Sequence, residues 1–246
     1  MIGVIADDLT GAAELAAIGW RHGFRAEVVR SGLPSGTAEL VCVDTDSRAS
    51  EPTEAAKRAA AAAKLLRAAG AKWIYKKVDS VLRGNVTAEV EAVMKQLKLE
   101  RALLLPANPS LGRVIRHGEY FLRGRPLHKT EFGHDPHFPR RSSKVLQLVK
   151  VPESFAMRVA NGDRTLTDGT IVVGDVESTL DLQDWTANCN DQMLPAGGAE
   201  FFNALLAVTN DGHKESVANG IPAPSGKEFF ITGTSTQASR KFVAAA

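Results

Sequence analysis

Two adjacent carboxylates, Asp7 and Asp8, follow a short apolar run and precede a stretch with helical spacing. In open α/β sheets ligands bind at the carboxyl ends of strands, which makes these side chains candidates for a binding site. Two neighbouring acids repel each other, so a cation, a basic side chain or a substrate hydroxyl must lie beside them. Asp8 can accept a hydrogen bond, and later a proton, from a sugar hydroxyl. The alternative is that Asp8 or Thr10 only caps the helix.

A second polar segment, residues 75–85, also leaves a predicted strand and enters a predicted helix. Its polar residues include Lys77, Asp79, Ser80, Arg83 and Asn85. Arg83 can hold a carboxylate through two parallel hydrogen bonds, and Gly84 lets the backbone approach a ligand closely. We expect this segment to share one crevice with the two adjacent acids. The alternative is that Ser80 or Asn85 caps the helix and that Asp79 pairs with Arg83 on the surface.

A third polar segment, residues 106–113, follows another predicted strand. Its prolines make the turn rigid, and Asn108 and Ser110 offer side-chain hydrogen bonds. The later residues His128, His134, Asp135 and His137 match no tetrahedral zinc spacing, so we predict no metal site. The sequence also contains no Walker A motif, no Gly-x-Gly-x-x-Gly and no Gly-x-Ser-x-Gly.

Alternating strands and helices must position these segments. Apolar runs predict strands at 2–6, 26–30, 40–43, 73–78, 102–105, 171–176 and 229–232. Helical spacing and end signals predict helices at 10–21, 52–69, 86–97, 180–187, 198–208 and 237–246, whereas 145–151 fits a strand or the start of a helix. This alternation predicts an α/β fold with a mostly parallel sheet and helices on both faces.

Residues 112–143 interrupt the alternation. Residues 120–127 are typical of a hairpin that turns at Arg123 and Gly124, and residues 131–143 are rich in His, Pro and Arg. A long loop in a compact domain is usually functional or disordered, and its aromatic and charged residues favour a binding loop. The alternative is a solvent-exposed excursion that only covers an edge of the sheet.

The composition excludes several classes of protein. A chain of 246 residues with 44% hydrophobic residues and a net charge of +2 is typical of a folded domain, not of a disordered one. No apolar run could span a bilayer and no signal peptide is present, so we expect a cytoplasmic protein without a membrane partner. Cys42 and Cys189 are expected to be buried thiols in a reducing compartment. A sequence pI of about 8.6 weakly favours a small anionic ligand and gives no sign of a nucleic-acid partner.

Four segments in order resemble the four-carbon acid sugar kinase family: IADDLTGAAE, YKKVDSVLRGN, LPANPSLGRVIRHGEYFLRGRPLHKTEFGHDP and LPAGGAEFF. The resemblance covers residues 1–208. It implies an N-terminal domain that binds a small anionic sugar acid, such as threonate, erythronate or 3-oxo-tetronate. It also implies a separate C-terminal domain that carries most of the nucleotide site, with ATP and Mg²⁺ as cofactors of the full-length proteins.

The resemblance further implies a set of site residues. The expected substrate-binding residues are Asp7, Thr10, Gly11, Lys77, Ser80, Arg83, Gly84, Asn85, Asn108, His128, Glu131 and Asp135. We infer that Arg83 and Lys77 hold the substrate carboxylate. The catalytic group is Asp8 or Asp79, which would orient the hydroxyl that is phosphorylated. No metal ligand is assigned.

The end of the sequence decides the expected domain organisation. Residues 1–208 are predicted to form the acid-sugar-binding domain, residues 209–226 a linker, and residues 227–246 the start of a nucleotide-binding domain. Thr234 and Thr236 stand where the family has hydroxyls that help to bind ATP, but the family's later glycine-rich segments do not occur in the chain. The expected function is the substrate-binding half of a kinase, inactive alone, whose partner is the missing C-terminal domain; a homodimer is left open.

Two other functions stay open. One is a non-catalytic sensor or interaction protein of the same fold, as in relatives labelled Hrp-dependent type III effector. The other is a complete small enzyme, such as an isomerase or aldolase, that acts on sugar acids without ATP.

Overall fold

The computed structural model describes residues 1–160 and 162–209. The predicted linker beyond Thr209 and the predicted segment 227–246, with Thr234 and Thr236, lie outside the described residues.

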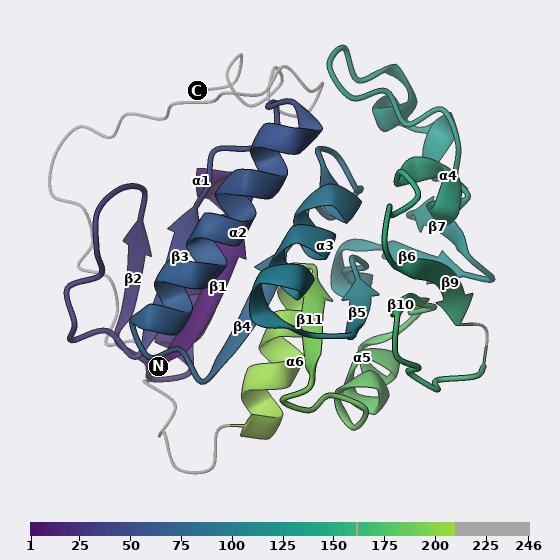
Figure 1. The fold of residues 1–246 in the computed structure, drawn as a ribbon. Helices are drawn as coiled ribbons and strands as arrows, with labels where there is room; N and C mark the ends of the chain where they lie inside the picture. Colours follow the sequence, from purple (N-terminus) through teal and green to yellow (C-terminus); the bar gives the residue numbers. More distant parts are fainter. Residues whose placement is uncertain (161, 210–246) are drawn as a thin grey trace, which may run out of the picture. The chain divides into compact units, whose positions relative to one another are not determined.

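An eight-stranded sheet forms the centre of the described region, in the order β2-β3-β1-β4-β11-β5-β10-β9 (Figure 1). Every neighbouring pair in this sheet is parallel, which confirms the predicted α/β fold. All residues of β1, β3, β10 and β11 are buried, and this explains why such strands read as continuous apolar runs. The strands are β1 (Ile2–Ala6), β2 (Ala26–Val29), β3 (Leu40–Asp44), β4 (Trp73–Lys77), β5 (Arg101–Leu105), β9 (Ala156–Ala160), β10 (Thr170–Gly174) and β11 (Met193–Gly197).

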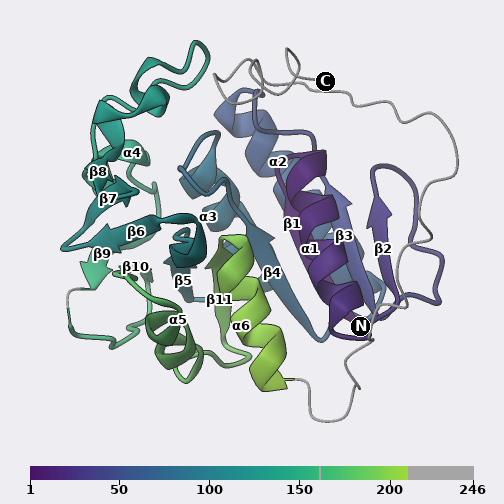
Figure 2. The same cartoon turned by 180° about the vertical axis from the view of Figure 1, so that it is seen from behind.

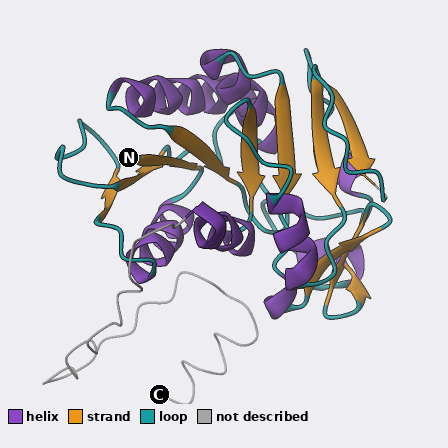
Figure 3. Cartoon of the chain, turned by 90° about the horizontal axis from the view of Figure 1, so that it is seen from below, coloured by secondary structure: helices purple, strands orange, loops and turns teal. Residues whose placement is uncertain are grey.

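Helices cover both faces of this sheet, as predicted. The helices α2 and α3 pack side by side on one face, and α1, α5 and α6 cover the other (Figures 1 and 2). Figure 3 shows the sheet between these two layers. The bounds are α1 (Leu9–Arg21), α2 (Pro52–Ala68), α3 (Val86–Leu97), α4 (Val145–Leu148), α5 (Thr179–Thr186) and α6 (Ala199–Thr209). The open choice at residues 145–151 resolves as the short helix α4.

A small antiparallel sheet occupies the region where the alternation breaks. Its strands are β6 (Arg113–Arg116), β7 (Glu119–Leu122) and β8 (Arg125–Pro126), and β7 and β8 form the predicted hairpin. Strand β6 was not predicted. Ile115 exchanges two backbone hydrogen bonds with Val176, and Tyr120 is fully buried, so this sheet is joined to the main body. Short 3₁₀ turns at Leu127–Lys129 and Glu131–His134 follow it.

Two strands of the large sheet, β9 and β11, were not predicted. Pro195 and Gly197 argue against a central strand at the position of β11. Pro195 precedes Ala196, the first residue of β11 that pairs with β4, so its missing N–H interrupts no pairing on that side. Strand β9 lies at the edge and is only partly buried, and its sequence therefore lacks an apolar run.

Candidate functional site

The carboxyl ends of β3, β1 and β4, three neighbouring strands, carry the candidate site. Asp7 follows β1 directly, Arg48 lies in the loop after β3, and Asp79 follows β4. The structure therefore brings together the first two polar segments of the sequence analysis. Because parallel strands end at one edge of a sheet, side chains that are far apart in the sequence meet there.

Arg48 joins the three carboxylates at this edge. Its Nε and Nη2 donate to Asp7 Oδ2 and Oδ1 at 2.7 and 3.0 Å. Its Nη1 lies 2.7 Å from Asp8 Oδ2 and 3.7 Å from Asp79 Oδ1. The partner required by two adjacent acids is thus a basic side chain. The sequence analysis missed Arg48, and the signal that would have found it is an arginine just after the strand beside β1.

Asp79 is held by a second arginine. Arg83 Nε and Nη2 donate to Asp79 Oδ2 and Oδ1 at 3.1 and 2.8 Å, and the backbone N–H groups of Val81 and Arg83 add two more bonds. Burial by itself would raise the pKa of Asp79, but the hydrogen bonds and charge of Arg83, with the charge of Arg48, lower it from 3.8 to about 2. The alternative, an Asp79–Arg83 pair on the surface, is confirmed for the pair. The pair is not on the surface, however, because Asp79 is buried.

The loop after β8 reaches the site through Asp135. Arg83 Nη1 lies 3.5 Å from Asp135 Oδ2, and the guanidinium carbon lies 5.8 Å from the centroid of the Phe132 ring. Burial opposes a charged Asp135, but backbone N–H groups of Phe138 and His137, together with Arg83, lower the pKa of this carboxyl. A part of the predicted binding loop therefore lies at the site.

The side chains of Asp8 and Lys77 both lie close to Gly11, which is in the first turn of α1. Asp8 Oδ1 accepts the Gly11 N–H at 2.8 Å, so Asp8 caps α1 and also pairs with Arg48. A Cβ at position 11 would lie only 2.8 Å from Asp8 Oδ1 and 3.5 Å from Lys77 Nζ, so a side chain there would have to displace the Asp8 carboxylate. Lys77 Nζ donates to the Val78 carbonyl and lies 3.4 Å from Glu14 Oε2. Thr10 is exposed, and its side chain makes no hydrogen bond within the described residues.

Gly84 and Asn85 fix the loops around Arg48. Gly84 has φ +83°, and a Cβ there would lie 3.2 Å from Arg48 Cγ and 3.3 Å from Asp7 Oδ2. Asn85 Nδ2 donates to the carbonyls of Ser47 and Ser50.

The alternative that Ser80 or Asn85 caps α3 with its side chain is wrong. Asn85 occupies the N-cap position, but its side chain makes no capping bond; its amide instead donates to the loop between β3 and α2. Ser80 Oγ instead accepts from Arg113 Nη1, and its carbonyl accepts from the Tyr120 hydroxyl. Ser80 thus connects β4 to the small antiparallel sheet.

Three further predicted site residues make no bond to Asp7, Asp8 or Asp79 in the described part of the chain. Asn108 is buried, and its Oδ1 accepts the backbone N–H of Glu200 at the start of α6. His128 is exposed and its Nδ1 lies 2.8 Å from Ser143 Oγ. Glu131 is exposed and has no partner among these residues.

A buried ion pair lies next to the site. Lys76 Nζ is 2.7 Å from Glu89 Oε2, and Ser47 Oγ donates to Glu89 Oε1 at 2.8 Å. The backbone N–H groups of Ser47 and Arg48 both donate to the Asp7 carbonyl. The pair therefore ties β4 and α3 to the loop that carries Arg48, a connection the sequence analysis did not anticipate.

Metal, thiol and membrane features complete the description. Within residues 1–160 and 162–209, no group of three or more His, Cys, Asp and Glu side chains is placed to hold a metal ion. No helix in the same residues is long and apolar enough to cross a bilayer. Cys42 is buried as predicted, whereas Cys189 is only half-buried; burial raises the pKa of both thiols, that of Cys189 to about 12.

Comparison with known proteins identifies relatives of this domain. A family model described as a sugar-binding N-terminal domain matches residues 2–205. The chain is 35% identical over 224 residues to the D-threonate kinase of Salmonella typhimurium, which covers 82% of this chain and 52% of that kinase. It is 26% identical over 266 residues to the 3-oxo-tetronate kinase of Pseudomonas fluorescens, which covers 97% of this chain and 61% of that kinase. The chain thus spans roughly half to three fifths of the length of these curated relatives.

Solved structures share the fold. A crystal structure from Bordetella bronchiseptica, described as a domain-swapped dimer with bound citrate, matches with a TM-score of 0.74 and 29% identity over 85% of this chain and 56% of that chain. A Haemophilus influenzae protein matches with a TM-score of 0.76 and 21% identity, over 88% of this chain and 57% of that chain. The second likeness concerns the fold alone.

Proposed function

This chain belongs to the family of sugar-binding N-terminal domains, and from that membership we propose that it binds a four-carbon sugar acid as the acceptor half of an ATP-dependent kinase. The observation that carries the proposal is the gathering of Asp7, Asp8 and Asp79 around Arg48 at the carboxyl edge of the sheet. Relatives named D-threonate kinase and 3-oxo-tetronate kinase support this class of substrate.

In the proposed site, arginines bind the carboxylate of the substrate and an aspartate binds its hydroxyl. A guanidinium can bind the substrate carboxylate, and Arg83 and Arg48 each keep N–H groups beyond those that hold the aspartates. Lys77 adds a positive charge near Gly11, at the start of α1. The citrate bound to the Bordetella relative is itself a small hydroxy acid, and it supports a ligand of this chemical class.

Asp8 is the better candidate to accept the proton of the hydroxyl that is phosphorylated. Asp79 is buried, and a pKa of about 2 makes it a weak base whose lone pairs already accept hydrogen bonds from Arg83 and Val81. The side chain of Asp8 is 26% exposed and can meet a substrate. Asp79 would instead fix the position of Arg83. Of the other predicted residues, Asp135 supports Arg83, whereas Asn108, His128 and Glu131 would need a contact that the described residues do not make.

The remaining parts of the proposal concern the whole kinase. ATP with Mg²⁺ would be supplied through a C-terminal nucleotide-binding domain, to which residues 227–246 with Thr234 and Thr236 would belong. We propose that residues 1–208 form the sugar-acid domain and residues 209–226 the linker. The chain by itself would bind substrate without phosphorylating it, would be located in the cytoplasm, and would be able to form a homodimer.

Calorimetry with threonate, erythronate and their 3-oxo forms tests the proposal. We expect one of them to bind, and Arg83→Ala to weaken its binding by at least about tenfold, as the loss of a charge-assisted pair requires. Arg58→Ala, which changes an exposed arginine paired with Glu54, is the matched control and should leave affinity unchanged. No binding of any of these acids would refute the proposal.

Enzymatic assays separate the other functions. Addition of ATP and Mg²⁺ to the chain with its sugar acid should release no ADP above background. Turnover of a sugar acid without ATP would favour an isomerase or aldolase instead. A sensor of the same fold would bind its acid but show no phosphoryl transfer when supplied with a C-terminal kinase half.

A further inference from the structure

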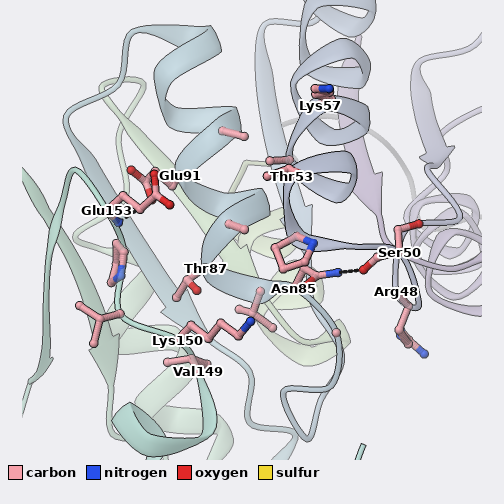
Figure 4. A pocket seen from close by; sticks show the side chains of 18 of the residues that line it. Arg48, Ser50, Thr53, Lys57, Asn85, Thr87, Glu91, Val149, Lys150 and Glu153 are labelled. Atoms are coloured by element: carbon pink, nitrogen blue, oxygen red, sulfur yellow. Dashed lines mark hydrogen bonds between the residues drawn. The ribbon is translucent and has the colours of Figure 1, made fainter. Parts of the chain in front are cut away.

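A cavity lies beside the cluster that Asp7, Asp8 and Asp79 form around Arg48. It has a volume of about 1020 Å³ and lies between α2, α3 and the segment 148–153 (Figure 4). Phe138 and Arg140 also line it. Arg48 also lines it, but the guanidinium of Arg48 is bound to Asp7 and Asp8. The cavity therefore adjoins the proposed sugar-acid site: it shares Arg48, Gly84 and Asn85 with that site, but none of its aspartates lines it.

Two helices begin at this cavity without side-chain caps. Neither Glu51, the N-cap residue of α2, nor Asn85, that of α3, makes a capping hydrogen bond. The backbone N–H groups of Val86, Thr87 and Ala88 have no acceptor among the described residues, and all three residues line the cavity. Free N–H groups and the positive ends of two helix dipoles favour an anion here.

The hydroxyl of Thr87 is a second observation, besides the two helix N-termini, that favours a bound ligand. Thr87 is 5% exposed, lines the cavity, and makes no side-chain hydrogen bond within the part of the chain that the structure describes. Figure 4 shows its side chain among those that face the cavity. The hydroxyl is not among the fully enclosed polar atoms that lack a partner, so it opens to the cavity, where an acceptor atom of a bound molecule can replace water as its hydrogen-bond partner.

The charges around the cavity also favour an anion, because five cationic side chains line it against the two carboxylates of Glu91 and Glu153: Arg48, Lys57, Lys95, Arg140 and Lys150. Lys57 and Lys150 are exposed and form no ion pair in the described region. The buried carboxylate of Glu91 is already satisfied, since it pairs with Lys95 at 2.8 Å and accepts the N–H groups of Glu153 and Ser154. The cavity wall between the two helices is formed by half-buried alanines, Ala56, Ala60, Ala88 and Ala92.

We infer that this cavity binds a small phosphate-bearing molecule. Its phosphate lies at the starts of α2 and α3, where it accepts hydrogen bonds from Thr87 and the free N–H groups and meets the charges of Lys57 and Lys150. Its uncharged body lies over the alanines. This site goes beyond the proposed sugar-acid site and does not depend on it.

Titration of the ¹⁵N-labelled full chain with inorganic phosphate, AMP and adenosine tests the inference by NMR. We expect saturable shifts of the Thr53 and Thr87 amides with phosphate and with AMP, tighter binding of AMP, and no binding of adenosine. Adenosine binding as tightly as AMP would overturn the role of the phosphate. Shifts at Asp8 and Gly11 alone, or no saturable shift, would overturn the site. Inorganic phosphate binding more tightly than AMP would overturn the placement of a ligand body over the alanines.

Variants separate this site from the sugar-acid site. Thr87→Val should weaken AMP binding about threefold to tenfold, the loss of one hydrogen bond, without lowering the unfolding temperature. Lys57→Gln with Lys150→Gln should weaken it at least as much, and Lys64→Gln, an exposed lysine of α2 outside the cavity, should not change it. Arg83→Ala should leave AMP binding intact while sugar-acid binding falls. Unchanged AMP affinity in Thr87→Val and in the double lysine variant would contradict the inference.

Discussion

Asp79 is a buried charge that two arginines hold, and its removal should cost stability. In Asp79→Asn, Arg83 and Arg48 lose a charged acceptor in a site that remains partly closed to water. We expect the free energy of unfolding to fall by about 2 kcal/mol at neutral pH, as measured by urea denaturation. Asp191→Asn, at an exposed position, is the control and should change stability little. Equal stability of Asp79→Asn and wild type would contradict the buried pair.

The lowered pKa of Asp79 also predicts how the stability of the protein depends on pH. The pKa of Asp79 is about 2 in the folded protein against 3.8 as its ordinary value, so the unfolded state takes up the proton first as the pH falls. The stabilisation by Asp79 is therefore complete above about pH 5 and is lost as the pH falls through 3.8 towards 2. The difference in urea midpoint between wild type and Asp79→Asn should shrink over this range. A difference that stays constant down to pH 3 would argue against the lowered pKa.

The types of the residues predicted part of the site. The direction of the side chains and the order of the strands explain the residues that were missed, Lys76 and Arg48. Consecutive residues of a strand point to opposite faces of the sheet, so Lys76 enters the layer of α3 while Lys77 points towards α1. The sequence analysis chose Lys77 and had no means to find the partner of Lys76. Arg48 was not predicted as a site residue because no motif surrounds it. Only the order of the strands in the sheet places it beside Asp7.

At the scale of elements, Gly84 lets the turn before α3 pack against Arg48. Gly84→Ala must adopt φ +83° and bring a Cβ to 3.2 Å from Arg48 Cγ, so we expect a loss of about 2 kcal/mol in stability together with weaker sugar-acid binding. Gly70 has φ +91°, and a Cβ there would meet no atom within 4 Å, so Gly70→Ala should cost only about 1 kcal/mol and leave binding unchanged. Urea denaturation and calorimetry measure both. Equal effects of the two variants would show that packing on Arg48 is unimportant.

The Lys76–Glu89 pair connects β4 to α3, and a double replacement can test it. Glu89→Gln leaves the buried ammonium of Lys76 without its counter-charge, and we expect a loss of about 3 kcal/mol. Lys76→Met combined with Glu89→Leu removes both charges and should recover much of this loss, because Ser47 keeps Thr45 as a hydrogen-bond partner. Urea denaturation of the two variants measures the difference. A double variant less stable than Glu89→Gln would contradict the explanation.

Elements with a strong local pattern were predicted well. The helix at residues 86–97 was predicted with its exact bounds as α3, since an apolar face and a glycine-containing start define it locally. Strand β11 was missed because its place depends on distant partners: Leu194 pairs with Ala102, and Ala196 pairs with both Leu104 and Lys76. A proline-containing segment can be a central strand only when such neighbours surround it, and one sequence read locally does not contain that information.

For the molecule as a whole, β11 joins two sets of strands that are otherwise separate in the sheet. On one side lie β4, β1, β3 and β2, and on the other β5, β10 and β9. Strand β11 is the last in sequence among them, so β4, beside β1, and β5, beside β10, each lack their second neighbour until the chain reaches residue 197. We therefore expect the two sides to unfold together.

Single-tryptophan variants can test this cooperativity, because Trp73 lies in β4 and Trp185 in α5, on the two sides of β11. Their fluorescence should report one common urea midpoint. Leu194→Ala removes a fully buried side chain from β11 and should lower the free energy of unfolding by about 3 kcal/mol, shifting both midpoints equally. Leu33→Ala, at an exposed position, should shift neither. Separate midpoints for Trp73 and Trp185 would show that the two sides fold independently, since a strand that truly joins them transmits its loss to both.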